Sequence, residues 1–258
     1  MNITAISVSR KSVWDQCTQL YKYKYHLKIP PPGPEPFYFT YGKIVHKIAE
    51  EFVLRKGKTA LGKVALMVLE GKIPMDAYNG ESFFAPPLPK AYSKRLPEHI
   101  ESIAKITKQL GTSGIVEYEF LYDLDPPNKK NVRGFIDRII KKDDNYFILD
   151  YKTSKKGIYR KTRSNITSDL QLRAYARVIQ REKDVPAKNI HAGLYYLEGA
   201  DLVGATFSDK SLRQAEESLL YTYKQIENTP EDKAWGNVGR HCRRCDYVKR
   251  CPFYRITS

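Results

Sequence analysis

Two short segments carry acidic and basic side chains at spacings that suit metal-assisted chemistry. They are Gly134-Phe135-Ile136-Asp137 and Ile148-Leu149-Asp150-Tyr151-Lys152. If these segments form a β-hairpin whose even-length loop is centred on residues 143–144, paired residue numbers sum to 287, and Asp137 lies opposite Asp150. Directly opposed residues of antiparallel strands project to the same side, with Cβ atoms about 5 Å apart. The two carboxylates would then share one divalent cation.

A lysine belongs to the same pattern. Lys152 follows Asp150 by two residues, so its side chain returns to the same face of the strand. Two carboxylates repel each other unless a hard cation such as Mg or Mn lies between them. A lysine beside the cation can position or activate the attacking water and stabilise the charge on a phosphorane. The alternative is a surface hairpin with Asp137 and Lys152 as solvated charges, although lone charges among apolar strand residues are costly.

The four cysteines indicate an inorganic centre that ties the two ends of the chain together. Cys242, Cys245 and Cys251 lie close together near the end of the sequence, and Cys17 lies far upstream. We expect no secretory signal, and cytosolic thiols are kept reduced, so metal ligation is favoured over disulfides. The spacing admits structural Zn or an iron–sulfur cluster, because both accept four thiolates. Cys17 as an ordinary buried cysteine is the remaining alternative.

Composition and charge limit the classes of partner. The 258 residues are 41% hydrophobic and 12% aromatic, enough for one large domain with a core. Lys and Arg total 44 against 29 Asp and Glu, a net charge of +15 that favours phosphate-bearing partners. No apolar stretch approaches the roughly 18 residues of a membrane span, so nucleic acid is favoured over a membrane. The expected location is the cytoplasm, of a prokaryote or of the host of a virus.

Hydrophobic periodicity predicts the elements that must position these residues. Helices are predicted at 8–28, 40–56, 59–70, 94–110, 167–183 and 209–228. Strands are predicted at 115–123, 132–141, 146–152, 190–197 and 202–207. Proline-rich connections at 30–36 and 85–89 separate the first helices. This order indicates an α/β sandwich around a mixed sheet rather than a doubly wound fold.

The acidic hairpin also resembles a known family. Asp137 followed by Asp150-Tyr151-Lys152 is similar to the PD-(D/E)XK nuclease signature, with Ile136 in place of the proline. Gly42-Lys43-Ile44-Val45-His46 resembles the G-x-x-x-H element, and Gln171-Leu172-Arg173-Ala174-Tyr175 resembles the Q-x-x-x-Y element. With the split cysteines, the chain resembles the RecB-like iron–sulfur exonucleases related to the CRISPR-associated adaptation nucleases and the AddB nuclease domain.

This resemblance implies a role for each motif residue. The divalent Mg or Mn would be bound by His46, Asp137, Asp150 and the backbone carbonyl of Tyr151. Lys152 would be the catalytic lysine. The scissile phosphate or DNA backbone would be held by Gln171 and Tyr175, which lie one helical turn apart. A [4Fe-4S] cluster with a structural task would be bound by Cys17, Cys242, Cys245 and Cys251. Without the resemblance, His46, Gln171 and Tyr175 could be ordinary surface or core residues.

The resemblance also implies the domain organisation. It predicts one nuclease domain over 1–258 with a restriction-endonuclease-like core at 113–230. A helical region covers 40–112, and 1–30 with 236–258 form the cluster-binding staple.

Other residues could contact nucleic acid or the metal. The loop from Lys155 to Arg163 carries five positive charges that could clamp phosphates. Tyr21, Tyr23 and Tyr25 could stack on unpaired bases, although core packing explains some of them equally well. A carboxylate of the first core strand, from Glu117 or Glu119, could support the metal, but solvated glutamates are common on strands.

These observations predict a metal-dependent DNA nuclease, an exonuclease acting on single-stranded DNA or DNA ends. The alternatives are a non-catalytic DNA-end-binding adaptor and a Zn-stapled nucleic-acid-binding protein, of which the second leaves the acidic hairpin unexplained. Residues 57–64 resemble the sequence of a phosphate-binding P-loop. However, Val64 replaces the Ser or Thr that would bind Mg. Unwinding would therefore need a helicase or another recombination or adaptation partner. DNA repair, recombination, CRISPR adaptation and viral genome processing are all open, as is oligomerisation.

Overall fold

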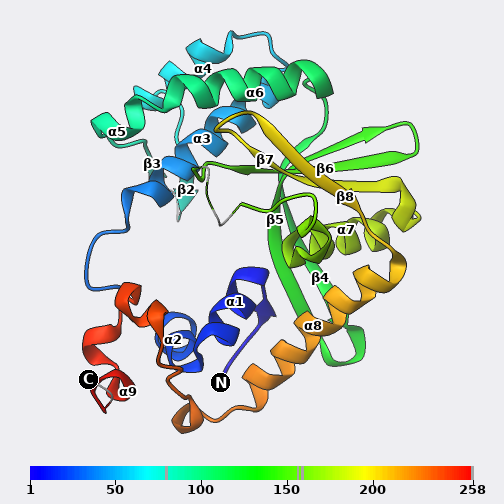
Figure 1. The fold of residues 1–258 in the computed structure, drawn as a ribbon. Coiled ribbons are helices and arrows are strands. Elements are labelled where there is room, and N and C mark those ends of the chain that lie inside the picture. Colours follow the sequence, from blue (N-terminus) through cyan, green and yellow to red (C-terminus); the bar gives the residue numbers. More distant parts are fainter. Residues whose placement is uncertain (79–80, 156, 158–159, 257–258) are drawn as a thin grey trace. The chain divides into compact units, whose positions relative to one another are not determined.

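The computed structural model describes residues 1–78, 81–155, 157 and 160–256. The chain divides into two compact units, whose elements are labelled in Figure 1. The first unit comprises Met1–Glu35, Glu119–Gly134 and Lys210–Ser258, and the second comprises Pro36–Tyr118 and Phe135–Asp209. Two long strands, β4 (Ile115–Asp125) and β5 (Lys130–Lys142), pair with each other and run from one unit into the other along the chain.

The second unit contains a mixed sheet. From the C-terminal part of β5, the strand order continues through β6 (Asn145–Lys152), β7 (Ile190–Tyr196) and β8 (Asp201–Thr206). β6 is antiparallel to β5 and parallel to β7, and β7 is antiparallel to β8. The predicted mixed sheet is therefore confirmed, because a parallel crossover joins two antiparallel hairpins.

The β5–β6 hairpin has the predicted register. Arg138 pairs with Leu149 and Lys142 pairs with Asn145, so paired numbers sum to 287. Asp143 adopts a φ of 53°, the left-handed conformation typical of two-residue hairpin loops. The paired residues end at Arg138 and Leu149, one step before Asp137 and Asp150.

Helices cover both faces of this sheet. On one face, α3 (Phe37–Leu54), α4 (Leu61–Leu69) and α6 (Leu96–Leu110) form a hydrophobic core with Leu149 and Tyr151 of β6 and Tyr195 of β7 (Figure 1). α3 is helical because its apolar residues recur every three or four positions, and this stripe is buried. Side chains alternate along β6, so Asp150 and Lys152 point to the opposite face, where α7 (Leu170–Lys183) packs.

Most predicted elements of this unit are observed within a few residues, with three additions. A short hairpin of β2 (Asp76–Tyr78) and β3 (Glu81–Phe83) follows α4, and α5 (Lys90–Ser93) precedes α6. Pro97 lies in the first turn of α6, where the missing N–H would have no helical acceptor.

The first unit is built on α1 (Val8–Gln16) and α8 (Asp209–Asn228). The Trp14 side chain of α1 donates to Gln225 of α8, and Tyr223 donates to the Ile3 carbonyl. The two-residue strand β1 (Ala5–Ile6) pairs in parallel with the start of β5. The short helix α9 (Pro252–Ile256) ends the described chain.

The prediction of one continuous helix over 8–28 was wrong. The helix breaks at Cys17, whose φ of −168° is extended, and resumes as α2 (Thr18–Tyr21) and a π-helical turn (Lys22–His26). The physical reason is a set of distant hydrogen bonds: Thr18 Oγ1 accepts from the Trp235 N–H at 2.7 Å, and the Gln19 N–H donates to the Trp235 carbonyl. Periodicity cannot reveal such contacts.

The described ranges contain no helix with both the length and the apolar character that crossing a bilayer requires.

Candidate active site

The centre of the site is a histidine held between two strands. His46 lies on α3, and its Nδ1 is 3.4 Å from Asp137 Oδ2 on β5. Its Nε2 lies 2.9 Å from the backbone carbonyl oxygen of Tyr151 on β6. The Tyr151 N–H in turn donates to Asp137 Oδ2 at 2.6 Å. The structure therefore brings the side chains of His46 and Asp137 and the Tyr151 carbonyl together.

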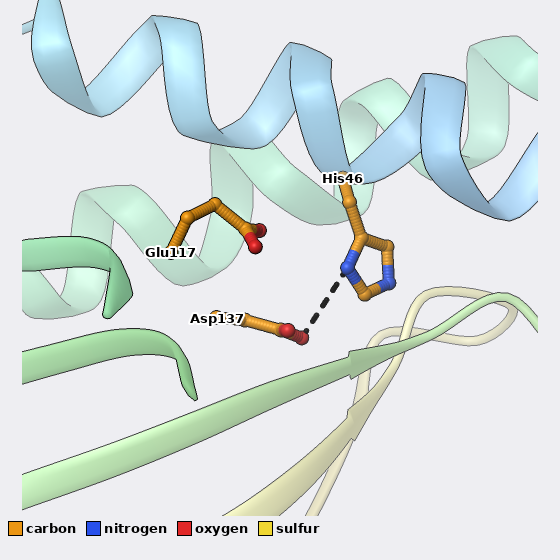
Figure 2. Close-up of side chains that lie close together, drawn as sticks. All are labelled: His46, Glu117 and Asp137. Carbon is orange, nitrogen blue, oxygen red and sulfur yellow. Dashed lines mark ion pairs between the residues drawn. The ribbon is translucent and has the colours of Figure 1, made fainter. Parts of the chain in front are cut away.

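Glu117 of β4 completes a potential metal site, as Figure 2 shows. One ligand atom from each of His46, Glu117 and Asp137 lies within 4.8 Å of the other two. Carboxylate oxygens and an imidazole nitrogen suit Mn, and the carboxylates suit Mg. From the sequence, Glu117 and Glu119 were equal candidates to support the metal, and the structure places Glu117 with His46 and Asp137.

The backbone of Glu117 is unusual for a strand. Its φ is 45°, in the left-handed region that non-glycine residues seldom adopt. This conformation interrupts the alternation of side chains along β4, and such strained residues are concentrated at functional sites. Glu119, the other glutamate of that strand, is mostly exposed and forms an ion pair with Arg133.

We call His46, Glu117 and Asp137 the trio. The electrostatics of this trio are those of a cation-binding site. Burial alone would lower the pKa of His46, but the charge and hydrogen bond of Asp137 outweigh burial and raise this pKa to about 9. Burial would raise the pKa of Asp137, but His46 and the Tyr151 N–H hold it below its ordinary value. Burial, and then the charge of Asp137, raise the pKa of Glu117 to about 7. The buried carboxylates thus compete for positive charge, which a divalent cation would supply.

A second set of contacts extends from Asp150 through Lys152 to α7. Lys152 Nζ lies 2.6 Å from Asp150 Oδ2 and donates to Gln171 Oε1 at 3.1 Å. Gln171 Nε2 then donates to the Tyr175 hydroxyl at 2.7 Å. Gln171 therefore contacts the lysine directly, and Tyr175 holds Gln171 in place. The structure thus joins these four residues by direct contacts, and Asp150, predicted as a metal ligand, does not belong to the His46–Glu117–Asp137 group.

The buried Asp150 is paired with lysine rather than with the trio. Burial, and then the charge of Asp137, raise the pKa of Asp150 to about 6. Burial would lower the pKa of Lys152, but Asp150 outweighs it and raises this pKa above its ordinary value. The lysine is therefore an ammonium at neutral pH, suited to stabilising negative charge.

His46, Glu117 and Lys152 line one groove of about 860 Å³. Besides site residues, its walls include three exposed or half-exposed aromatic side chains and two lysines of α3. These lining residues are Tyr38, Phe39, Phe135, Lys43 and Lys47.

All four cysteines lie in the first unit and line a common cavity. They are free thiols. Within the described part of the chain, no three cysteine sulfurs lie within 4.8 Å of one another. A tetrahedral Zn site with Zn–S bonds of about 2.3 Å would hold its sulfurs about 3.8 Å apart.

One of the predicted stacking residues is a core residue. Tyr21 is buried against Trp14, whereas Tyr23 packs on Tyr247 and is partly buried. In the basic loop, Arg160 lies over the Tyr196 ring and pairs with Glu198. Lys156, Ile158 and Tyr159 lie outside the described residues.

Comparison with known proteins identifies the family. The model of the PD-(D/E)XK nuclease superfamily matches residues 5–252. No curated protein matches the chain.

Two solved structures are similar to this chain. One is named "Putative exonuclease", from Eubacterium rectale, with a TM-score of 0.55, 13% identity and coverage of 93% of this chain and 88% of that one. The other is SSO0001, with a TM-score of 0.45, 13% identity and coverage of 98% and 88%. The family match extends over nearly the whole sequence, including every residue of the site described above. The chain belongs to the PD-(D/E)XK nuclease superfamily.

Proposed function

We propose that this nuclease is a Mg- or Mn-dependent DNA exonuclease that acts on single-stranded DNA or frayed DNA ends. The observation that carries the proposal is a potential cation site of His46, Glu117 and Asp137, two of whose residues, His46 and Glu117, line the same groove as Lys152. Exonuclease activity is further supported by the name of the Eubacterium rectale structure, whose fold is similar.

The donor set fits a divalent cation. His46, Glu117, Asp137 and the Tyr151 carbonyl would hold it, with Asp150 beside them. When bound, such a cation polarises a phosphoryl oxygen and lowers the pKa of a bound water.

Lys152 supplies the remaining chemistry. Because Asp150 keeps this side chain protonated, its role is to donate to a phosphate oxygen as negative charge develops there. Gln171, fixed by Tyr175, aims the ammonium. The ion pair with Asp150 limits how far the Lys152 ammonium can move. The chain thus presents a positioned positive charge before substrate arrives, which avoids reorganisation during the reaction.

We propose that the cysteines bind a [4Fe-4S] cluster that joins residues 1–30 to 236–258. The four thiols line one cavity, and their sulfurs are spread more widely than the ligands of a single Zn ion. A multi-iron cluster suits wider spacing because its four ligands bind different iron atoms. On this basis the chain is grouped with the RecB-like iron–sulfur exonucleases, with a helicase or a recombination or adaptation complex as partner.

The test is cleavage of end-labelled single-stranded DNA by anaerobically purified protein with Mg or Mn, and with EDTA. Lys152→Ala should abolish metal-dependent products while DNA binding is retained. Lys142→Ala, at an exposed lysine beside the hairpin loop, is the matched control and should cut normally. Undiminished cutting by Lys152→Ala would refute the assigned catalytic site. Binding without cutting by the wild type would favour the end-binding adaptor.

A further inference from the structure

Three aromatic side chains of the groove are unusually exposed. Tyr38 is 54% exposed, Phe39 is 50% exposed and Phe135 is 45% exposed. All three line the groove that contains His46 and Lys152. Tyr38 and Phe39 belong to α3, and two neighbouring rings of this helix are not exposed in this way. Tyr41 is buried in the core, and Phe37 packs on Tyr92. Exposed aromatic area beside a polar site is typical of a binding surface.

Tyr38 and Phe39 form one continuous apolar surface. Consecutive residues of a helix point in directions about 100° apart, yet these two rings have centroids 4.3 Å apart and an interplanar angle of 39°. They belong to the first turn of α3, directly after Pro36, whose ring fixes the backbone at the start of the helix. The pair therefore lies at the very start of the helix.

The charges that line the groove suit a phosphate backbone. Lys43 and Lys47 follow the aromatic pair along α3, and Lys152 lies at the catalytic site. Lys47 forms ion pairs with Glu50, which also lines the groove, and with Glu51, so Lys43 and Lys152 are the better candidates for phosphate contacts. Aromatic rings and lysines that line the same groove match an unpaired strand, because bases stack on the rings while phosphates meet the ammonium groups.

We propose that Tyr38, Phe39 and Phe135 form a stacking site for unpaired bases of the strand being cut, and that this site makes the nuclease prefer single strands to duplex. The inference rests on the proposed function. In a duplex, both faces of each internal base are already covered by its neighbours. Only an unpaired nucleotide can place its base on these rings without the cost of opening a pair.

The experiment measures whether binding depends on a base. Short single-stranded oligonucleotides, each with one abasic position moved along the sequence, keep every phosphate and remove one base at a time. Binding is measured with the full chain, with Ca in place of Mg, and gels verify that the oligonucleotide stays intact. For the wild type, at least one abasic position should weaken binding by about 5- to 150-fold. In the Tyr38→Ala/Phe39→Ala variant that penalty should disappear.

Three controls make the result specific. Phe84→Ala removes a comparably exposed ring of the same unit that is not among the groove-lining residues, and it should keep the abasic penalty. Tyr38→Trp should also keep it, because any large ring can stack. Melting curves verify that each variant is folded. With 2-aminopurine at the sensitive position, the wild type should quench fluorescence and the double alanine variant should not.

The outcomes separate this inference from the proposed function. If the wild type cuts DNA but binds intact and abasic strands equally, the stacking site is refuted and the proposed nuclease activity is upheld. Equal weakening of single-stranded and duplex binding by the double variant would also refute it. If base-dependent binding is found but no metal-dependent cutting, the stacking site stands and the catalytic assignment fails.

Discussion

His46 Nδ1 and Asp137 Oδ2 lie 3.4 Å apart, although one residue belongs to helix α3 and the other to strand β5. Because the other nitrogen of the same ring contacts the Tyr151 carbonyl, which can only accept, both ring nitrogens carry protons when no cation is bound. This agrees with the raised pKa of His46. A cation that binds here must displace a proton from the ring.

Substitution of Glu117 should weaken cation binding. Glu117→Gln keeps the shape of the side chain but removes one of the charges that face the cation, so Mn affinity should fall about tenfold or more. Isothermal titration with Mn measures the change. Glu119→Gln alters the exposed glutamate of the same strand and should bind Mn as the wild type does. Equal affinities for all three proteins would exclude Glu117 as a ligand.

Cation binding should stabilise the wild type but not an Asp137 variant. Asp137→Asn keeps an oxygen that can accept from the Tyr151 N–H, so the metal-free fold should persist. A ligand at 100 times its Kd adds about 2.7 kcal/mol to the free energy of unfolding. Saturating Mn should therefore raise the Tm of the wild type by several degrees and leave that of the variant nearly unchanged. Similar Mn-induced shifts in both would mean that the cation binds elsewhere.

Gln171 should act by positioning Lys152. Gln171→Leu removes the side-chain acceptor of the ammonium and leaves the ion pair with Asp150. We expect kcat to fall roughly tenfold with little change in KM, because the lost contact orients a group that acts in the transition state. Gln171→Glu, which restores an acceptor, should recover part of the loss. A change confined to KM would instead indicate a direct contact with bound DNA.

The cysteine site should contain iron and support the fold. Anaerobically purified wild type should be coloured and contain iron and acid-labile sulfide, whereas Cys17→Ser should lose most of both and melt at a lower temperature. The cause is the loss of one of four thiols that line a single cavity. A colourless wild type loaded with Zn would overturn the cluster assignment.

Stability should fall in mild acid because of His99. This residue is fully buried and lies 2.9 Å from the Tyr41 hydroxyl through Nδ1. Burial, with Arg95 nearby, lowers its pKa from 6.5 to about 4. Between these two pH values His99 is protonated in the unfolded chain but neutral in the folded one. The contribution of His99 to the free energy of unfolding is therefore fully present above pH 6.5 and is lost as the pH falls toward 4. The loss is at most on the order of 3 kcal/mol.

Denaturant unfolding across this pH range provides the measurement. His99→Gln should flatten the dependence on pH. Tyr41→Phe removes the hydrogen bond but leaves the histidine buried, so it should lower stability at every pH and keep the slope. An unchanged slope in His99→Gln would assign the effect to another group.

Local sequence determined the β5–β6 hairpin. Strand alternation has a period of two, and a two-residue loop at Asp143 and Asp144 leaves a single register, so the pairing from Lys142 and Asn145 to Arg138 and Leu149 follows from counting. The four-residue spacing of Gln171 and Tyr175 likewise places both on one side of α7, where they form a hydrogen bond. Periodicity also gave the order of the main elements of the mixed sheet.

Tertiary structure decided what depends on contacts between distant segments. Glu117 joins the trio through a left-handed backbone conformation that no pattern of residue types encodes. The helix break at Cys17 depends on hydrogen bonds to Trp235. Exposure of aromatic side chains was also decided by tertiary packing: Tyr21, a predicted stacking residue, is buried, and Tyr38 lines the groove. The sequence alone determined which residues could do chemistry, because spacing is local, whereas burial and exposure depend on which segments pack against each residue.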